Sequence, residues 1–316
     1  MSHRTAVRPR PSSAAPPPER HAIAERAARV LRRREARIAY ALILPYVLLF
    51  LVFRMLPAIA SIGLSFADYS LAGTLSWVGL EHYERLAADP TFWEALRVTS
   101  VYAVISVPMI LLTSLVMALL IRRPLRGLRF FRSVYFLPVM TSLVLAGVIW
   151  RWIYSDAGAL NSMLESVGVA SVPWLGDERL VLPVLSSVAT WTRFGFDMLI
   201  LLAALLSVPP ELEEAARVDG AGPWHVFRYV VLPHLRPALF FVLVIETVNA
   251  VQVFDVIYVM TGGGPVRAST TLVFLLYKRG FEFFEFGYAA AIGVVLFAIT
   301  LVAAVVQRRF FGGSTA

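Results

Sequence analysis

The stretch EEAARVDGAGPWHVFRYVVLPHLRP, Glu213 to Pro237, decides how the rest of this chain is interpreted. It mixes charged residues, glycines and prolines, yet it lies between two long apolar runs. Pro209 and Pro210 just before it suit the entry to a helix, and the glutamates that follow suit the positive end of the helix dipole. The run from Asp219 to Pro223 consists of turn residues and predicts the end of that helix.

A second short helix is predicted after this turn. Trp224, Phe227 and Val231 recur at intervals of three and four residues and form one apolar stripe. Pro233 is expected to break this helix before Pro237 opens the next apolar run. The residues thus predict two short helices at an angle to each other. An ordinary amphipathic loop packed against lipid headgroups is the alternative that they leave open.

The chain around this stretch has the composition of an all-α membrane protein. Of its 316 residues 58% are hydrophobic and only 16% are charged, whereas about a quarter of the residues in soluble domains are charged. The apolar residues come in runs of about 20, the length of a membrane-crossing helix. Six transmembrane helices are predicted, at 39–60, 100–121, 134–153, 182–206, 239–260 and 288–306.

Positive charge predicts the orientation of these spans. Most lysines and arginines fall in the N-terminal tail and in the loops after the second and fourth spans. The positive-inside rule therefore predicts that both termini and these two loops are cytoplasmic, although the fifth loop also carries three positive residues. For the tail at 1–37 we expect a largely disordered basic segment followed by a surface helix, and this interpretation is favoured over an organellar transit peptide.

Several kinds of chemistry are absent from the sequence. It has no cysteine, so disulfides, thiolate metal sites and cysteine nucleophiles are excluded. It has neither a His-Glu-x-x-His nor a Gly-x-Ser-x-Gly motif, which argues against an intramembrane enzyme. Its single lysine, Lys278, follows no phosphate-loop glycine pattern, so the chain is not expected to hydrolyse ATP itself. We expect no cofactor, no metal and no nucleic acid on this chain.

The segment from Glu214 to Pro237 resembles the EAA loop of binding-protein-dependent ABC importer permeases. In that family the loop forms a coupling helix that docks into a groove on a cytoplasmic ATPase subunit. The resemblance implies that Gly220 permits the tight turn and that acidic residues meet basic partners on the ATPase. The residues assigned to coupling are Glu213, Glu214, Ala215, Ala216, Asp219, Gly220, Ala221, Leu232 and Pro233.

A second group of residues comprises Phe254-Asp255, Thr261–Pro265, Thr270, Thr271 and Phe286–Ala291. Together these residues resemble the carbohydrate-type permeases, the subfamily of the first maltose permease subunit. The resemblance covers about 93–309. The chain lacks the large insertion and the extra spans of the maltose subunit, so it is more similar to the shorter six-span sugar and glycerol-3-phosphate permeases. The resemblance implies a type I importer permease fold and divides the chain into a tail at 1–37, a first span and outer loop at 38–92, a permease core at 93–309 with its coupling loop at 209–237, and a tail at 310–316.

The same resemblance implies a set of partners: a second homologous permease, two ABC ATPase subunits that bind ATP and magnesium, and an extracytoplasmic sugar-binding protein. The binding protein is expected to face the loop Gly262, Gly263, Gly264 and Pro265. The function predicted is ATP-driven sugar import by alternating access in the bacterial cytoplasmic membrane. The alternative is a secondary transporter driven by an ion gradient, in which Glu246 and Asp255 carry protons.

Polar residues inside the spans are expensive in lipid and indicate a substrate path. Arg193 and Asp197 are four residues apart, on one helix face. The alternative is that Arg193 and Asp197 form a structural ion pair and that the nearby asparagine and glutamine side chains hold helices together. Arg193 also suits a phosphorylated or charged ligand. Phe194 is a further candidate for an aromatic ring that packs against the apolar face of a sugar. The residues predicted for a substrate path from their own chemistry are Trp191, Arg193, Phe196, Asp197, Glu246, Asn249 and Gln252. The resemblance implies sugar contacts at Trp191, Thr192, Arg193 and Phe196 and at Glu246, Ala250 and Val253, and so adds Thr192, Ala250 and Val253 to this path.

Overall fold

The computed structural model describes residues 38–69, 75–122, 135 and 137–311. The predictions for the tails at 1–37 and 312–316 and for most of the second loop lie outside these residues. The chain divides into two units, Met1–Ala60 and Ser61–Ala316, and each is described by itself.

The first predicted span is a helix that runs from Ile38 to Leu64. It contains a π-helical turn, η1 (Leu51–Met55), followed by α2 (Leu56–Leu64). Pro57 lies just after η1. Because proline has no N–H to donate and its ring crowds the carbonyl four residues earlier, a wider turn at this place keeps the helix continuous.

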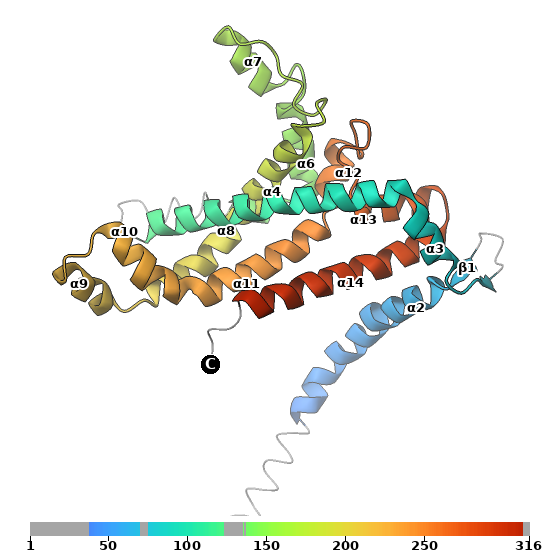
Figure 1. The fold of residues 1–316 in the computed structure, drawn as a ribbon, viewed down its shortest axis with the longest axis horizontal. Coiled ribbons are helices and arrows are strands. Elements are labelled where there is room, and N and C mark those ends of the chain that lie inside the picture. The colour runs from blue at the N-terminus through green and yellow to red at the C-terminus, as the bar shows by residue number, and fades with distance from the viewer. Residues whose placement is uncertain (1–37, 70–74, 123–134, 136, 312–316) are drawn as a thin grey trace, which may run out of the picture. The chain divides into compact units, whose positions relative to one another are not determined.

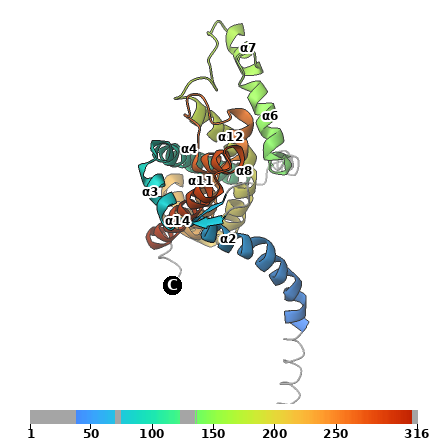
Figure 2. The same cartoon turned by 90° about the vertical axis from the view of Figure 1, so that its right-hand side faces the viewer.

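The second unit is a helical bundle. Its long helices are α4 (Pro90–Ile121), α8 (Val181–Leu206), α11 (Leu232–Val251) and α14 (Phe286–Phe311). They run side by side, and α11 packs against the other three (Figures 1 and 2). Asp89 caps α4 by accepting a hydrogen bond from the Thr91 N–H at 2.8 Å, and Pro90 occupies the first helical position, where no N–H is needed.

Short elements occupy the two ends of this bundle. The end called here the α9 end carries α9 (Pro210–Val218), α10 (Pro223–Val226) and the π-helical turn η2 (Phe227–Val231). Toward the other end, the α3 end, lie α3 (Glu81–Ala88), α13 (Leu272–Tyr277) and the π-helical turn η3 (Lys278–Glu282) (Figure 1). The antiparallel strands β1 (Ala67–Tyr69) and β2 (Leu75–Trp77) pair Ala67 with Trp77.

Three further helices complete the unit. α6 (Leu143–Ile153) and α7 (Ala159–Ser166) stand out from the bundle in both views, and α12 (Asp255–Met260) packs against α6 (Figures 1 and 2). The core is apolar along the whole bundle. It includes Tyr102, Leu185 and Ile257 between α4, α8 and α12, and Met198, Leu205 and Leu235 closer to the α9 end.

The helix ends correct the sequence predictions in three places. Five described helices have the length and hydropathy of membrane spans, at 38–64, 90–121, 181–206, 223–251 and 286–310. The predicted span at 134–153 is interrupted at Thr141 and Ser142, and only its 11-residue part α6 is an unbroken helix. The predicted span at 239–260 ends early, since α11 stops at Val251 and the chain is non-helical at 253–254 before α12.

The third correction concerns Pro233, which was expected to break the helix after the turn and does not. The helix is continuous from Pro223 through α10, η2 and α11 to Val251. Pro233 is the second residue after η2, and the wider turn lets the helix continue although proline cannot donate a backbone hydrogen bond, as at Pro57. The segment after Gly222 is therefore the beginning of a membrane-length helix and not a separate short one.

Candidate functional site

A cavity of about 230 Å³ lies between α4, α8, α11 and the start of α12. Polar groups from different helices meet on its walls. The end of α11 explains part of the lining, because the chain leaves the helix after Val251 and turns Gln252, Val253 and Phe254 toward the same space. Its lining residues are Tyr102, Ser106, Ile110, Leu143, Ala189, Arg193, Glu246, Asn249, Ala250, Gln252, Val253, Phe254, Asp255 and Val256.

An ion pair between α8 and α11 is the main polar feature of this cavity. The Arg193 Nη1 donates to Glu246 Oε1 at 3.2 Å, and Asn249 Nδ2 donates to the same oxygen at 3.1 Å. Glu246 is buried, with 1% of its surface exposed, whereas about a third of the Arg193 side chain is exposed. The second carboxylate oxygen of Glu246 has no hydrogen-bond partner among the described residues.

Asp197 is not the partner of Arg193, although the two lie four residues apart on α8. Both Asp197 oxygens are buried without a hydrogen-bond partner in the described part of the chain. Arg193 instead reaches across to α11, where Glu246 lies. The structural ion pair within α8, one of the alternatives left open by the sequence, is therefore not formed.

A second cavity, of about 270 Å³, adjoins the first. It touches α8 at Thr192, Arg193 and Phe196. Phe196 lies about one turn after Arg193, and α8 runs toward α9 (Figure 1). Leu143, Arg193 and Glu246 line both cavities. The ion pair therefore lies where the two cavities meet, and the remaining lining residues of the second cavity are Val139 and Thr141.

Most of the residues predicted for a substrate path line one of these cavities. The exceptions are Asp197 and Trp191, which packs edge-on against Trp150 with ring centres 5.7 Å apart. Tyr102 and Ser106 were missed by the sequence reasoning, and their spacing of four residues within an apolar span was the available signal. The predicted residues found in the walls are Thr192, Arg193, Phe196, Glu246, Asn249, Ala250, Gln252 and Val253.

The turn after α9 is a Schellman motif. The Gly220 N–H bonds the Arg217 carbonyl at 3.0 Å, and the Ala221 N–H bonds the Ala216 carbonyl at 2.9 Å. Gly220 has a φ of +84°, a conformation that residues with a Cβ rarely adopt. The turn residues from Asp219 to Pro223 thus predicted the end of this helix, and the φ of Gly220 agrees with the tight turn that the resemblance implied.

The rest of the coupling segment divides into buried and exposed residues. Glu213 is buried and accepts hydrogen bonds from Arg122, at the end of α4, and from Arg217. Its carboxylate therefore holds α9 against α4. Exposed on the same segment are Glu214, Ala215 and Asp219, together with the apolar side chains of Leu212, Val218 and Trp224. Ala216, Ala221, Leu232 and Pro233 are half-buried.

The loop Gly262–Pro265 follows α12. Gly262 and Gly263 both have positive φ values, 57° and 85°. A Cβ on Gly263 would collide with Phe274 and Thr270, so the backbone packs too closely here for another residue. Thr270 Oγ1 also donates to the Gly263 carbonyl at 3.0 Å. These contacts fix the loop against α13.

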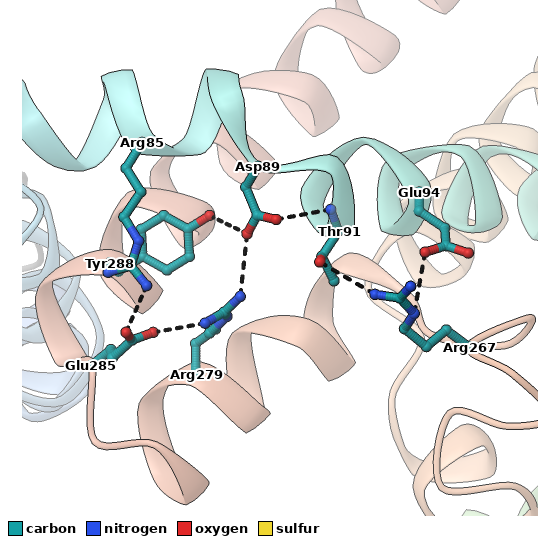
Figure 3. Close-up of polar contacts among 8 residues, drawn as sticks. All are labelled: Arg85, Asp89, Thr91, Glu94, Arg267, Arg279, Glu285 and Tyr288. Atoms are coloured by element: carbon teal, nitrogen blue, oxygen red, sulfur yellow. Dashed lines mark hydrogen bonds and ion pairs between the residues drawn. The ribbon is translucent and has the colours of Figure 1, made fainter.

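An ionic network joins α3 and the start of α4 to η3 and the start of α14 (Figure 3). Asp89 accepts hydrogen bonds from Tyr288 Oη at 2.8 Å and from Arg279 Nη2 at 3.3 Å, in addition to its capping bond. Arg279 and Arg85 both bind Glu285, at 3.1 and 2.6 Å. Burial acts to raise the pKa of Asp89, but the hydrogen bonds from Tyr288 and Thr91 and the charge of Arg279 together lower this pKa below its ordinary value.

None of the described residues form a cluster of three or more histidines and carboxylates that could hold a metal ion.

Comparison with known proteins gives consistent matches. Residues 126–312 match the family described as binding-protein-dependent transport system inner membrane component. The chain is 34% identical to the probable ABC transporter permease protein YurN of Bacillus subtilis, over 85% of this chain and 96% of that protein. It is 34% identical to the arabinooligosaccharides transport system permease protein AraP of Halalkalibacterium halodurans, over 87% of this chain and 88% of that one. It is 32% identical to the trehalose/maltose transport system permease protein MalF of Thermococcus litoralis, over 88% of this chain and 95% of that one.

Among solved structures, the fold is similar to a chain of a bacterial ABC transporter involved in the import of the acidic polysaccharide alginate. The TM-score is 0.79, the sequence identity is 25%, and the match covers 91% of this chain and 100% of the other.

Proposed function

Because the chain belongs to the family of binding-protein-dependent transport system inner membrane components, we propose that it is the membrane-spanning permease subunit of an ATP-driven sugar importer. The family and the five long apolar helices make it a multi-pass membrane protein. In the proposed mechanism an extracytoplasmic binding protein delivers the sugar, and the permease carries it inward by alternating access. Such a subunit transports and does not hydrolyse ATP.

The observation that carries this proposal is the coupling segment at the α9 end. It presents exposed apolar and acidic side chains next to a tightly hydrogen-bonded turn, and Glu213 fixes it to the end of α4 through Arg122. A surface that is rigidly joined to a long helix can pass a movement of a docked ATPase to the walls of the cavity, since α4 also supplies Tyr102 and Ser106. ATP and magnesium then belong to two ATPase subunits.

The chain is proposed to have six spans and cytoplasmic termini. The sixth span is proposed to be α6, together with the helical residues 137–140 ahead of it. With the α9 end on the cytoplasmic side, the loop Gly262–Pro265 faces the extracytoplasmic side and is available to the binding protein. A second homologous permease completes the path.

The substrate is proposed to be a sugar for two reasons. Two relatives compared above are named for the transport of arabinooligosaccharides and of trehalose or maltose. The first cavity here also combines hydroxyl, amide, carboxylate and guanidinium groups with the rings of Tyr102 and Phe254, and these groups suit the hydroxyls and the apolar faces of a sugar.

Affinity purification of the tagged chain from detergent-solubilised membranes tests the proposal. We expect mass spectrometry to identify an ABC-type ATPase and a second permease in the complex. In proteoliposomes the complex should hydrolyse ATP faster when the sugar-loaded binding protein is present. A chain that purifies alone and transports sugar under an ion gradient without ATP would instead identify a secondary transporter and contradict the proposal.

A further inference from the structure

The two cavities described above are separated by very few side chains. Arg193, Glu246 and Leu143 are the residues that line both, and two of these three form the ion pair. The Arg193 Nη1 and Glu246 Oε1 are 3.2 Å apart, so the pair is closed in this structure. A solute that crosses between the cavities at this shared wall meets the ion pair.

The direction of the helices places the cavities on opposite sides of the pair along the bundle. α11 runs away from the α9 end, and its residues in the first cavity, Asn249 and Ala250, follow Glu246. α8 runs toward the α9 end, and Phe196, which lines only the second cavity, follows Arg193. The first cavity thus lies toward the α3 end and the second toward the α9 end.

The chemistry of the pair allows a hydroxylated molecule to open it. Arg193 and Asn249 both donate to Glu246 Oε1, and Oε2 is buried without a partner. A guanidinium has five N–H donors, of which one is used here on the carboxylate. A sugar hydroxyl can donate a hydrogen bond to a carboxylate oxygen and accept one from the guanidinium. It can therefore replace the hydrogen bond that Arg193 and Glu246 lose when they separate. Without such a replacement, separation leaves a buried charge alone, which is strongly unfavourable.

We propose that Arg193 and Glu246 form an internal gate of the translocation path, closed by their ion pair and opened when sugar hydroxyls take over its hydrogen bonds. This proposal rests on the importer function proposed above and names how that same path is kept closed between substrates. The negative charge of an acidic sugar repels the Glu246 carboxylate at this contact, whereas an uncharged sugar meets no such repulsion. The gate therefore favours uncharged sugars over acidic ones.

The test uses the complete complex in inside-out vesicles, with the other subunits also free of cysteine. Because this chain has no cysteine, a single introduced thiol is the only reactive site on it. Thr141→Cys reports on the second cavity and Ser106→Cys on the first. A membrane-impermeant thiol reagent is added on the cytoplasmic side, in the absence of sugar, and the rate of labelling is measured.

With the ion pair intact, we expect Thr141→Cys to react quickly and Ser106→Cys slowly. Glu246→Gln or Arg193→Gln should each make Ser106→Cys react roughly tenfold faster, because either change leaves the other ion without its charged partner and so disfavours the closed arrangement. The exchange of Arg193→Glu with Glu246→Arg should restore slow labelling. Arg85→Gln is the matched control, since it removes an ion pair with Glu285 that lines neither cavity.

Two results would overturn the gate. One is a Ser106→Cys that reacts as fast as Thr141→Cys while the pair is intact. The other is an unchanged Ser106→Cys rate in both single variants, after co-purification of the ATPase has shown that the complexes assemble. Sugar uptake by the parent complex is measured alongside. A parent that takes up no sugar counts against the proposed function, whereas a transporting parent with unchanged labelling counts against the gate alone.

Discussion

Replacement of Gly220 tests the link between the turn after α9 and the function of the complex. Gly220 has a φ of +84°, and a Cβ added to it would meet no atom within 4 Å. A substitution here therefore strains the backbone without a steric clash with the rest of the chain. The left-handed conformation costs a residue with a Cβ about 1–2 kcal/mol of free energy. For a β-branched residue this cost is about 3 kcal/mol. Asparagine tolerates the left-handed region and should cost least.

A graded series follows from these magnitudes. Gly220→Asn should retain most of the ATPase activity that the sugar-loaded binding protein stimulates, Gly220→Ala should lose part of it, and Gly220→Val should lose most. A cost of about 2 kcal/mol lowers the population of the native turn roughly thirtyfold relative to its unfolded form. The assay is stimulated ATP hydrolysis by the reconstituted complex, with co-purification of the ATPase as a second measurement of docking.

Gly222 provides the matched control. It is two residues away and also has no atom within 4 Å of an added Cβ, but its φ is −69°, which any residue can adopt. Gly222→Val should therefore behave like the parent. If Gly220→Val is as active as Gly222→Val, or if Gly220→Asn is as inactive as Gly220→Val, then the left-handed turn is not what the coupling segment requires.

Three further predictions concern stability. Asn161 is fully buried and makes hydrogen bonds to the Val172 backbone and the Trp174 ring, so Asn161→Leu should lower the melting temperature by leaving these groups unsatisfied at about 1–3 kcal/mol each; an unchanged melting temperature would contradict this. The pKa of Asp89 is lower in the folded protein than in the unfolded chain, so its carboxylate stabilises the fold above the unfolded pKa, and this contribution is lost as the pH falls through the folded pKa. Asp89→Asn should therefore be less stable than the parent at neutral pH. The difference in stability should shrink in acid when unfolding is measured as a function of pH. Gly195→Ala should destabilise the bundle by about 1–3 kcal/mol, because its Cβ would collide with the carbonyl of Tyr135, whereas Gly63→Ala meets no atom and is expected to be neutral in the same thermal assay.

Local chemistry in the sequence determined much of this fold. Runs of apolar residues predicted spans at 39–60, 100–121, 182–206 and 288–306, because a chain in lipid must satisfy its backbone hydrogen bonds within each span. All four lie within longer helices, at 38–64, 90–121, 181–206 and 286–310. The turn at Gly220 was equally predictable, since few other residues adopt its conformation. The assignment of coupling, binding-protein and sugar contacts to particular residues, and the orientation of the spans, stay predictions.

What the sequence left open was decided by contacts between segments that are distant in the chain. Pro233 was expected to end a helix, but a π-helical turn before it lets the helix continue to Val251. Arg193 had a carboxylate four residues away on its own helix and yet binds Glu246 on another. A long guanidinium side chain can reach several carboxylates, and the packing of α8 against α11 determines which one it meets. Sequence spacing measures distance along one helix only, so both the ion pair and its position between two cavities follow from the tertiary structure.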